Sequence, residues 1–393
     1  MVKKIAIIIE RALPALGGAE RSVFELAEAL RAIGHKVDIL AAAGRPAEHV
    51  RIICRRRTHK RTGFLRFAGI LRHHLKTEKY DIVHSTLPFS FADVYQPRGG
   101  TYTEAARRNA ASYGKVAMIR FKKVTAAANI RRSILLAAEK KLASASDGPV
   151  IAALSKYVAR QFSGHYGTPD GRLVVIPNGV KPPVYDKPAA LRLRQRLAVQ
   201  MGADPDRAVV FLFAANNFRL KGLASLIEAT RAAEDKGPAN PVCLVVAGSD
   251  RRAPYERMAR HLAVSRIIYF DKKNGLDNLL AAVDAAVLPT FYDPASRFIL
   301  EALAAGKPAV TTAFNGAAEM FVHGRHGLVI KDPRDIDALA AALRFFSIRG
   351  NIEAASRAIF EDDIAGKVSI ESAAMRLDEL YESIAARRSG GKT

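Results

Sequence analysis

Two carboxylates and a run of potential hydrogen-bond donors lie close together in the segment 289–308. Asp293 and Glu301 are separated by seven residues, and the second acid is expected about two turns into a helix. The backbone N–H groups at the start of that helix can bind a phosphate. The segment therefore offers groups for a sugar, a diphosphate and a ribose. The residues at the helix start are Ser296, Arg297, Phe298 and Ile299.

A second group of candidate residues leaves the expected strand 208–215 and enters a helix. It contains Asn216, Arg219 and Lys221, followed by Gly222. A guanidinium and an ammonium beside a helix N-terminus can neutralise a diphosphate leaving group. Charge alone favours an ordinary solvated surface, because exposed Arg and Lys are common. The position at a strand end, next to a glycine, favours a diphosphate clamp.

Both acids also have purely structural explanations. Asp293 precedes Pro294 and can act as a helix N-cap, since proline is favoured in the first turn. Glu301 lies between apolar residues, where a carboxylate needs a partner. A ribose diol would satisfy both of its oxygens.

Glycines and one further acid complete the donor-side candidates. Gly17 and Gly18 follow the first expected strand, where the backbone can approach a ligand closely. A tight turn is the commoner explanation for such a pair. The full Gly-x-Gly-x-x-Gly spacing is absent, so we expect no dinucleotide cofactor. Glu319, after the expected strand 309–312, is expected to help form the wall of a nucleoside site.

Two Asp-x-Asp pairs superficially match a metal-binding motif. Asp204 and Asp206 lie in a polar loop before a strand, and Asp335 and Asp337 lie at a helix start. Neither pair falls at the carboxyl end of a strand. We therefore interpret both as surface features and expect no metal.

The elements that must position these residues alternate between strand and helix. A length of 393 residues with 49% hydrophobic residues predicts two domains. The alternation predicts an α/β fold with doubly wound parallel sheets. We expect two Rossmann-like domains, 1–183 and 184–369, facing each other across a ligand-binding cleft. A C-terminal helix, 370–386, is expected to pack back onto the first domain.

The expected strands begin and end at apolar runs. In the first domain they are 4–9, 37–42, 81–84, 150–154 and 173–176; in the second they are 208–215, 242–247, 266–270, 285–288, 309–312 and 327–330. The first helix is expected to bury a stripe that runs from Val23 to Ile33 and to stop at Gly34.

The net charge of +23 implies an anionic partner: nucleic acid, an anionic membrane face or a phosphorylated substrate. Basic residues cluster at 45–79 and 107–141. Cations and apolar residues interleave in 63–71, which suits an interfacial helix and equally a helix whose apolar side faces the core. No nucleic-acid-binding motif is present, so we expect no nucleic acid. The two cysteines and the absence of a signal peptide or spanning segment indicate a cytoplasmic protein.

Taken together, the motifs resemble glycosyltransferase family 4, the retaining enzymes of GT-B fold, over nearly the whole chain. Within that family the chain is similar to the lipopolysaccharide core glucosyltransferases. This closer similarity rests on Ala92-Asp-Val-Tyr95, on the Tyr-Asp-Pro-Ala-Ser form of the acidic motif and on the basic first half of the chain. The motifs that carry the family resemblance are Gly17-Gly18-Ala-Glu-Arg21, Ile176-Pro-Asn-Gly179, Lys221-Gly222, Asp293 to Glu301, Ala305-Gly306-Lys-Pro308, and Asn315-Gly316 with Glu319.

The resemblance implies transfer of a hexose, glucose by preference, from a nucleotide diphosphate sugar with retention of configuration and without metal or cofactor. Asp293, Lys221 and Arg219 would act in catalysis, and Glu301 would hold the ribose. It implies an anionic glycan or glycolipid acceptor and a peripheral location on the inner face of the cell membrane. Donors such as GDP-mannose or UDP-N-acetylhexosamine, and a nucleotide-sugar epimerase or binder of related fold, remain alternatives. The acceptor-side candidates are Glu20, Arg21, Asp93, Arg98 and Gly99.

The chain departs from the family pattern at three places. Asp293 stands where the family usually has Glu. Asn216 occupies the usual position of the clamp arginine, and Arg219 is the expected substitute. The family histidine that meets the donor sugar has no certain equivalent, and the region of Arg98 is the best candidate.

Overall fold

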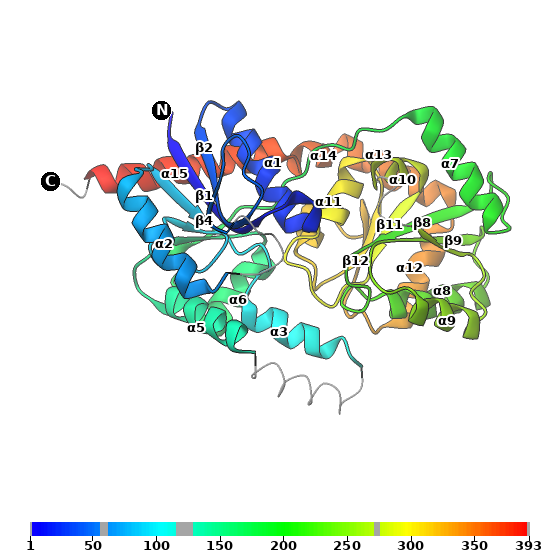
Figure 1. The fold of residues 1–393 in the computed structure, drawn as a ribbon. Coiled ribbons are helices and arrows are strands. Elements are labelled where there is room, and N and C mark those ends of the chain that lie inside the picture. The colour runs from blue at the N-terminus through cyan, green and yellow to red at the C-terminus, as the bar shows by residue number, and fades with distance from the viewer. Residues whose placement is uncertain (1, 56–61, 115–128, 271–275, 391–393) are drawn as a thin grey trace. The chain divides into compact units, whose positions relative to one another are not determined.

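This computed structural model describes residues 2–55, 62–114, 129–270 and 276–390. The described residues form two units, each built around one parallel β-sheet (Figure 1). The first unit comprises Met1–Ala110, Lys115–Gly179 and Ile370–Thr393, and the second comprises Ala111–Gly114 and Val180–Ser369. The two α/β units confirm the fold class predicted from the sequence.

The first sheet has seven strands within the described residues, in the spatial order β3-β2-β1-β4-β5-β6-β7. Sequence analysis missed β3, whose apolar residues are interrupted by arginines, and β5, which has two residues. The strands are β1 (Lys4–Ala12), β2 (Lys36–Gly44), β3 (Val50–Arg55), β4 (Ile82–Ser85), β5 (Val94–Tyr95), β6 (Val150–Ala153) and β7 (Leu173–Val175).

Helices cover both faces of this sheet because side chains alternate along each strand. Ile5, Ile7 and Ile9 of β1 pack in a core with helices α1 and α15, whereas Ala6 and Ile8 pack with α2 and α5. The helices among the described residues of this unit are η1 (Pro14–Leu16), α1 (Gly18–Ala32), α2 (Phe64–Thr77), α3 (Tyr102–Ala111), α5 (Ile130–Ser144), α6 (Lys156–Tyr166), η2 (Asp170–Arg172) and α15 (Ile370–Gly390).

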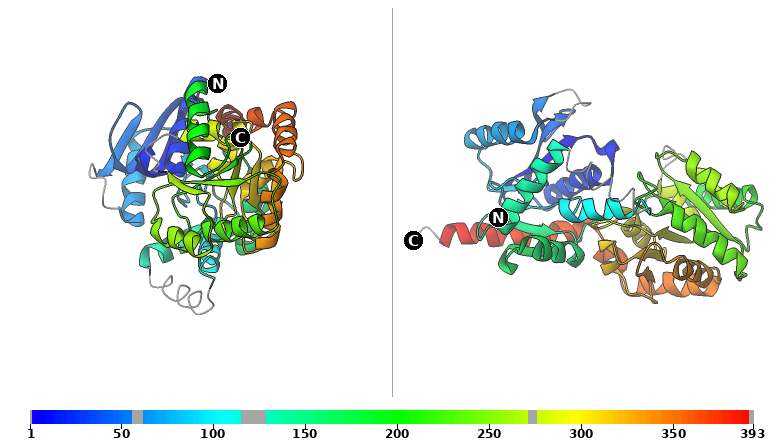
Figure 2. Two further views of the ribbon diagram at one scale, coloured as in Figure 1. Left: turned by 90° about the vertical axis from the view of Figure 1, so that its right-hand side faces the viewer. Right: turned by 90° about the horizontal axis from the view of Figure 1, so that it is seen from below.

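The C-terminal helix α15 belongs to the first unit although it follows the whole second unit in the chain. Leu377 and Tyr381 are buried beside α1 and the sheet, and Tyr381 Oη lies 2.6 Å from His84 Nδ1. Figure 2 shows this helix, in red, beside the blue elements of the N-terminal sheet.

Two helices can be compared in detail with the predictions made from the sequence. In α2, Phe67, Ala68 and Leu71 are buried in the core, so the apolar side of the segment 63–71 faces the sheet. In α1 the expected stripe ends early: Ile33 follows the last helical residue and is 44% exposed.

The second sheet has six strands in the described part of the chain, in the order β10-β9-β8-β11-β12-β13. From β8, the chain first builds β9 and β10 on one side and then crosses to build β11 to β13 on the other. The strands are β8 (Val209–Ala214), β9 (Val242–Ala247), β10 (Ile267–Phe270), β11 (Ala285–Leu288), β12 (Ala309–Thr312) and β13 (Gly327–Ile330).

This reversal of direction creates a topological switch point between β8 and β11, where open α/β sheets bind ligands at the carboxyl ends of the strands. Where the structure describes the second unit, its helices are α7 (Lys187–Gln200), α8 (Leu223–Asp235), α9 (Ala253–His261), α10 (Leu276–Ala282), α11 (Arg297–Ala304), η4 (Gly316–Met320), α12 (Ile336–Phe346), α13 (Arg349–Glu361) and α14 (Ile364–Lys367).

Candidate active site

Lys221 and Asp293 meet at the switch point of the second sheet. Lys221 Nζ lies 2.5 Å from Asp293 Oδ2 and donates to the Tyr292 carbonyl oxygen at 3.0 Å. Lys221 comes from the loop after β8 and Asp293 from the loop after β11. Their side chains are 19% and 14% exposed, so the ion pair is mostly shielded yet accessible to a ligand.

Gly222 allows the two loops to approach each other. It has φ +81°, and a Cβ atom on it would lie 2.0 Å from the Pro289 carbonyl oxygen. Any other residue would therefore be strained and would collide with the neighbouring backbone. The contact is reinforced by the Phe291 N–H, which donates to the Leu220 carbonyl oxygen at 2.9 Å.

Asn315 joins a third loop, the one after β12, to the same place. Its side chain is 1% exposed, and its Oδ1 accepts from the N–H groups of Ser296 and Ala317, each at 3.1 Å. The Asp293 N–H donates to the Phe314 carbonyl oxygen at 2.9 Å. Three loops from neighbouring strands are thus bonded into one surface.

The helix α11 begins in this surface, with Ser296 as its N-cap. The N-cap role considered for Asp293 is wrong, because the Ser296 hydroxyl accepts from the Ile299 N–H. Two of the four expected phosphate donors are therefore already engaged, those of Ser296 and Ile299. The Phe298 side chain is buried in the core, so only its backbone can face a ligand.

Glu301 has a protein partner. Arg297 Nη2 donates to Glu301 Oε1 at 3.0 Å, and both side chains are 9% exposed. The burial of this carboxylate therefore does not by itself require a ligand, and its ribose-binding role stays a prediction. Glu301 is held one helical turn after Arg297, in the helix that starts at the bonded loops.

The other donor-side candidates lie on the same edge with different partners. Asn216 is exposed, and its Oδ1 accepts from Ser249 Oγ at 3.4 Å. Arg219 is half-buried in the turn before Gly222, whose N–H donates to the Arg219 carbonyl oxygen at 3.2 Å. Glu319 is exposed on η4.

A cavity of about 460 Å³ lies at the carboxyl ends of β9 and β10, beside the loop after β8. Phe218 and Tyr269 line it, together with Asp250, whose Oδ2 accepts from the Phe218 N–H at 2.7 Å. Sequence analysis missed these residues. The sequence contained one indication of this cavity, because Gly248 directly follows a buried strand. In the structure, a Cβ atom added to Gly248 would lie 1.9 Å from the Ala215 carbonyl oxygen.

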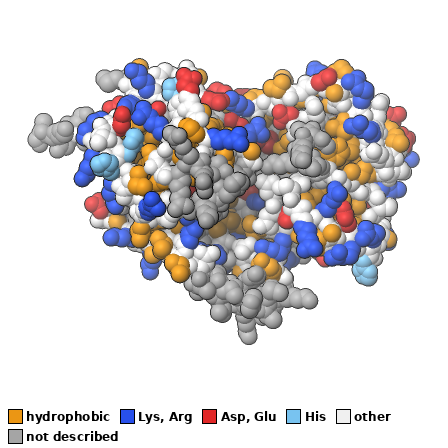
Figure 3. Space-filling model, in the orientation of Figure 1, with side chains coloured by type: hydrophobic (Ala, Val, Ile, Leu, Met, Phe, Trp, Pro, Cys, Tyr) orange, Lys and Arg blue, Asp and Glu red, His pale blue; other side chains and the backbone are white. Residues whose placement is uncertain are grey.

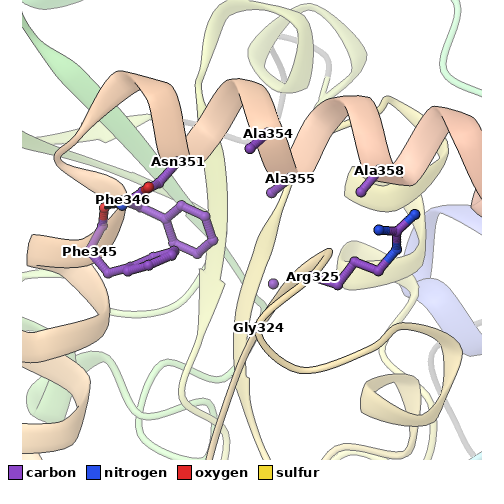
Figure 4. A pocket seen from close by; sticks show the side chains of 9 residues that line it. Gly324, Arg325, Phe345, Phe346, Asn351, Ala354, Ala355 and Ala358 are labelled. Atoms are coloured by element: carbon purple, nitrogen blue, oxygen red, sulfur yellow. Dashed lines mark hydrogen bonds between the residues drawn. The ribbon is translucent and has the colours of Figure 1, made fainter.

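A second cavity, of about 330 Å³, lies at the opposite edge of this sheet, at the first residue of β13. Figure 4 shows the small side chains of α13 along it, with Phe346 and Arg325 toward its two ends. Arg325 is already paired with Asp362 through Nε at 2.7 Å. This cavity is separate from the candidate active site.

The loop after β1 and the first turn of α1 carry four candidates at the carboxyl edge of the first sheet. Gly17 has an extended backbone, with φ 170°, and caps α1, which begins at Gly18. Glu20 and Arg21 lie in the first turn. Arg21 Nε donates to Glu25 Oε1 at 2.7 Å, and Glu20 Oε1 lies 3.7 Å from Arg11 Nη2.

Arg98 lies at the same edge of the first sheet, after β5. Its Nη1 donates to Asn178 Oδ1 at 3.0 Å, which joins it to the Ile176-Pro-Asn-Gly179 motif. Gly99 is exposed beside it. Asn178 was part of a family motif but was not among the predicted site residues.

Asp93 is at odds with its predicted acceptor role, because it precedes β5 and lies at the amino edge of the sheet. Its Oδ2 accepts from the Val83 N–H at 2.8 Å, and its Oδ1 contacts Arg388 of α15. Burial raises the pKa of this carboxyl, against the Val83 hydrogen bond and the Arg388 charge. These contacts indicate a structural role.

Comparison with known proteins decides the family. The profile of glycosyl transferases group 1 matches residues 199–357, and that of Glycosyltransferase Family 4 matches residues 16–182. Both units are therefore covered. The chain belongs to glycosyltransferase family 4.

Individual relatives agree with this family. The lipopolysaccharide glucosyltransferase WaaG of Escherichia coli (strain K12) is 24% identical over 351 residues, which is 84% of this chain and 85% of that protein. The crystal structure of WaaG matches with a TM-score of 0.67 and 23% identity, covering 97% of this chain and 98% of that one. The structure of Anabaena Alr3699/HepE in complex with UDP-glucose matches with a TM-score of 0.70 and 17% identity, covering 97% and 100%. The chain thus has the GT-B fold of two Rossmann-like domains, as predicted.

The Asp-x-Asp pairs of this glycosyltransferase have local structural roles. Asp335 caps α12 through the Ala338 N–H at 2.9 Å, and Asp204 accepts from the Asp206 N–H at 2.9 Å. Among the described residues, no group of three or more His, Cys, Asp or Glu side chains is arranged to hold a metal ion.

The structure describes only part of the two basic clusters, 45–79 and 107–141. Lys and Arg side chains are more frequent than Asp and Glu on the face displayed in Figure 3. No helix within the described residues is long and apolar enough to span a bilayer. Several cations of the two clusters lie outside the described residues: Arg56, Arg57, Lys60, Arg61, Lys115, Arg120, Lys122 and Lys123.

Proposed function

We propose that this protein is a retaining hexosyltransferase that moves glucose from UDP-glucose to an anionic glycan or glycolipid, such as a lipopolysaccharide inner core. The observation that carries the proposal is the Lys221–Asp293 pair at the switch point, with Nζ and Oδ2 2.5 Å apart. A cation for the diphosphate and a carboxylate for sugar hydroxyls stand side by side there. The similarity of this chain to WaaG, a lipopolysaccharide glucosyltransferase, and to HepE, whose structure is in complex with UDP-glucose, supports this choice of donor and acceptor.

Lys221 would stabilise the charge that grows on the diphosphate as the bond from the anomeric carbon to the phosphate oxygen breaks. Asp293 would hold the hexose by its hydroxyls. The acceptor hydroxyl attacks the same face of the sugar, and its proton passes to the departing phosphate oxygen. Positioning and electrostatics then supply most of the rate acceleration, and we propose that neither a metal nor a cofactor takes part.

The nucleoside would occupy the cavity beside the β8 loop. Its volume of about 460 Å³ suits a base and part of a ribose, and the half-buried ring of Tyr269 offers a face for a planar base. Glu301, in the helix that starts at the bonded loops, would accept hydrogen bonds from the ribose hydroxyls. Arg219 would add charge at the diphosphate.

The acceptor would be presented at an anionic membrane face. The helix α2 contains no acidic residue, and Arg66, Arg72 and Lys76 are exposed on it. Lys140 and Lys141 are exposed on α5, which shares a core with α2. Such a surface is attracted to anionic lipid at a cytoplasmic membrane face, at about 1 kcal/mol per cation near the surface.

Transfer itself tests the proposal. The purified protein is incubated with UDP-glucose, GDP-mannose or UDP-N-acetylglucosamine and a lipopolysaccharide inner-core acceptor, with and without EDTA. We expect UDP release that depends on both UDP-glucose and acceptor, is insensitive to EDTA and yields an α-linked product by NMR. Interconversion of nucleotide sugars without transfer, or release of no nucleotide from any donor, would refute the proposal.

Membrane contact has its own test, sedimentation with vesicles. We expect binding to vesicles that contain phosphatidylglycerol, little binding to pure phosphatidylcholine, and weakening between about 0.1 and 1 M salt because of screening. The triple variant Arg66→Ser, Arg72→Ser, Lys76→Ser should bind less, whereas Arg344→Ser and Arg357→Ser in the second unit serve as a matched control. Binding that resists high salt would contradict the electrostatic attachment.

A further inference from the structure

The ion pair between Arg297 and Glu301 is unusual for its burial. Both side chains are 9% exposed, and Nη2 lies 3.0 Å from Oε1. Removing two charges from water is costly, and an ordinary pair at this helical spacing stabilises an exposed helix only slightly. Stability alone is therefore a weak reason for burying this pair.

The position of Arg297 adds a second cost. It is the first residue of α11, where the partial positive charge of the helix end disfavours a cation. The Glu301 carboxylate supplies an anion that compensates this guanidinium. The guanidinium charge of Arg297 therefore acts on the Glu301 carboxylate.

The start of α11 is also fixed in space. The Ser296 N–H donates to Asn315 Oδ1 at 3.1 Å, and the Asp293 backbone is bonded to Phe314 and Gly316, each at 2.9 Å. Arg297 follows directly from these anchored residues. A guanidinium held at this point restricts the rotamers of a carboxylate one turn later.

We infer that Arg297 is a positioning residue, which orients the Glu301 carboxylate so that the site distinguishes ribose from deoxyribose in the donor nucleotide. The inference rests on the proposed function, in which Glu301 accepts from the ribose hydroxyls. Losing a hydrogen bond to a charged group corresponds to about 10- to 100-fold in affinity. A carboxylate that is free to rotate would lose most of that discrimination.

The experiment compares UDP with 2′-deoxy-UDP by isothermal titration calorimetry. For the wild-type protein we expect 2′-deoxy-UDP to bind about 10- to 100-fold more weakly than UDP. In Arg297→Met and in Glu301→Gln the ratio of the two dissociation constants, that of 2′-deoxy-UDP over that of UDP, should fall to about 3 or less. Arg297→Lys should restore part of the ratio, because an ammonium can still pair with Glu301 but lacks the planar fork.

Two further variants separate positioning from helix stability. The double variant Arg297→Met/Glu301→Gln should have the same ratio as either single variant, since coupled residues are not additive. Arg231→Met removes another pair with the same helical spacing, Arg231–Asp235 on α8, and should leave the ratio at the wild-type value.

The outcomes distinguish this inference from the proposed function. If Arg297→Met lowers the melting temperature but keeps the full ratio, the pair is only structural and the inference is wrong. A wild-type protein that binds both nucleotides equally also overturns it, although the transferase proposal survives through its own assay. Failure to bind UDP or UDP-glucose at all would sink the proposed function as well.

Discussion

The carboxyl edges of the two sheets differ in how their candidate residues are held. At the second sheet, Lys221, Asp293 and Asn315 bond three neighbouring loops to one another. At the first sheet, Arg98 bonds to Asn178 while Arg21 pairs within its own helix. At the second edge three loops are bonded into one surface, whereas at the first edge the Arg98–Asn178 bond joins two segments and the Arg21–Glu25 pair stays within one helix.

This difference fits the partners that we propose for the two edges. A nucleotide sugar has a diphosphate of fixed shape and charge, and a rigid set of loops can match it in advance. A large glycan acceptor presents many hydroxyls over a wider area. The predictions below therefore place the largest effects at the second edge.

Lys221→Ala should have the largest effect on activity. We expect turnover to fall by about 10²–10³-fold, because the lysine acts on charge that develops in the transition state, while the affinity for UDP-glucose changes less. Steady-state kinetics with calorimetric donor binding measures both. Lys236→Ala, which removes another Lys–Asp contact, to Asp337 at 2.7 Å, is the matched control. Unchanged turnover in Lys221→Ala would contradict the clamp assignment.

Gly222→Ala should destabilise the second unit and weaken donor binding together. The added methyl group would lie 2.0 Å from the Pro289 carbonyl oxygen, so the loops must separate, at a cost of about 2–3 kcal/mol. Gly202→Ala is the control, since Gly202 has φ +64° with nothing within 4 Å. It should cost only about 1 kcal/mol. Equal melting temperatures for the two variants would argue against the close approach.

Glu139 should make the first unit sensitive to pH. It is buried and accepts from Tyr95 Oη at 2.8 Å, Tyr166 Oη at 2.7 Å and the Tyr102 N–H at 2.7 Å. Burial raises its pKa to about 7 despite these three donors. Nearby Glu104 differs: burial raises its pKa, but hydrogen bonds from arginines and a histidine lower it overall, to about 2.

Because the folded pKa of Glu139 lies above its unfolded value, its stabilising contribution is full below about pH 4.5 and is lost as the pH rises through about 7. We expect about 1–3 kcal/mol over this range. Glu139→Gln removes the titration, so wild type minus variant stability should fall from pH 4.5 to 7.5 in denaturant titrations. Burial lowers the pKa of His84 to about 3. The titration of His84 is common to wild type and variant, so its contribution cancels in this difference. A pH-independent difference would contradict the assignment.

Asp93→Asn should have the smallest effect, a loss of about 1 kcal/mol in stability and no change in the KM for the acceptor. The residue lies at the amino edge of the sheet, away from any ligand at the carboxyl edge. Arg98→Ala, at the carboxyl edge, should raise the KM for the acceptor. An acceptor KM that rises with Asp93→Asn instead would restore the original interpretation of this residue.

The sequence alone predicted the parts of the protein that depend on local patterns. The apolar runs of β8, β9 and β11 indicated buried parallel strands, because a strand covered on both faces needs no alternation. The spacing of Asp293 and Glu301 placed a loop carboxylate before a helical one. Gly222 marked the turn in which Lys221 meets its partner.

Only the tertiary structure decided which groups satisfy one another. Arg297 rather than a ligand partners Glu301, and Ser296 rather than Asp293 caps α11. Asp93 falls at the amino edge of the first sheet, where the Val83 N–H and Arg388 contact its carboxylate. These outcomes depend on distances between segments remote in sequence, and the periodicity within one segment carries no information about them.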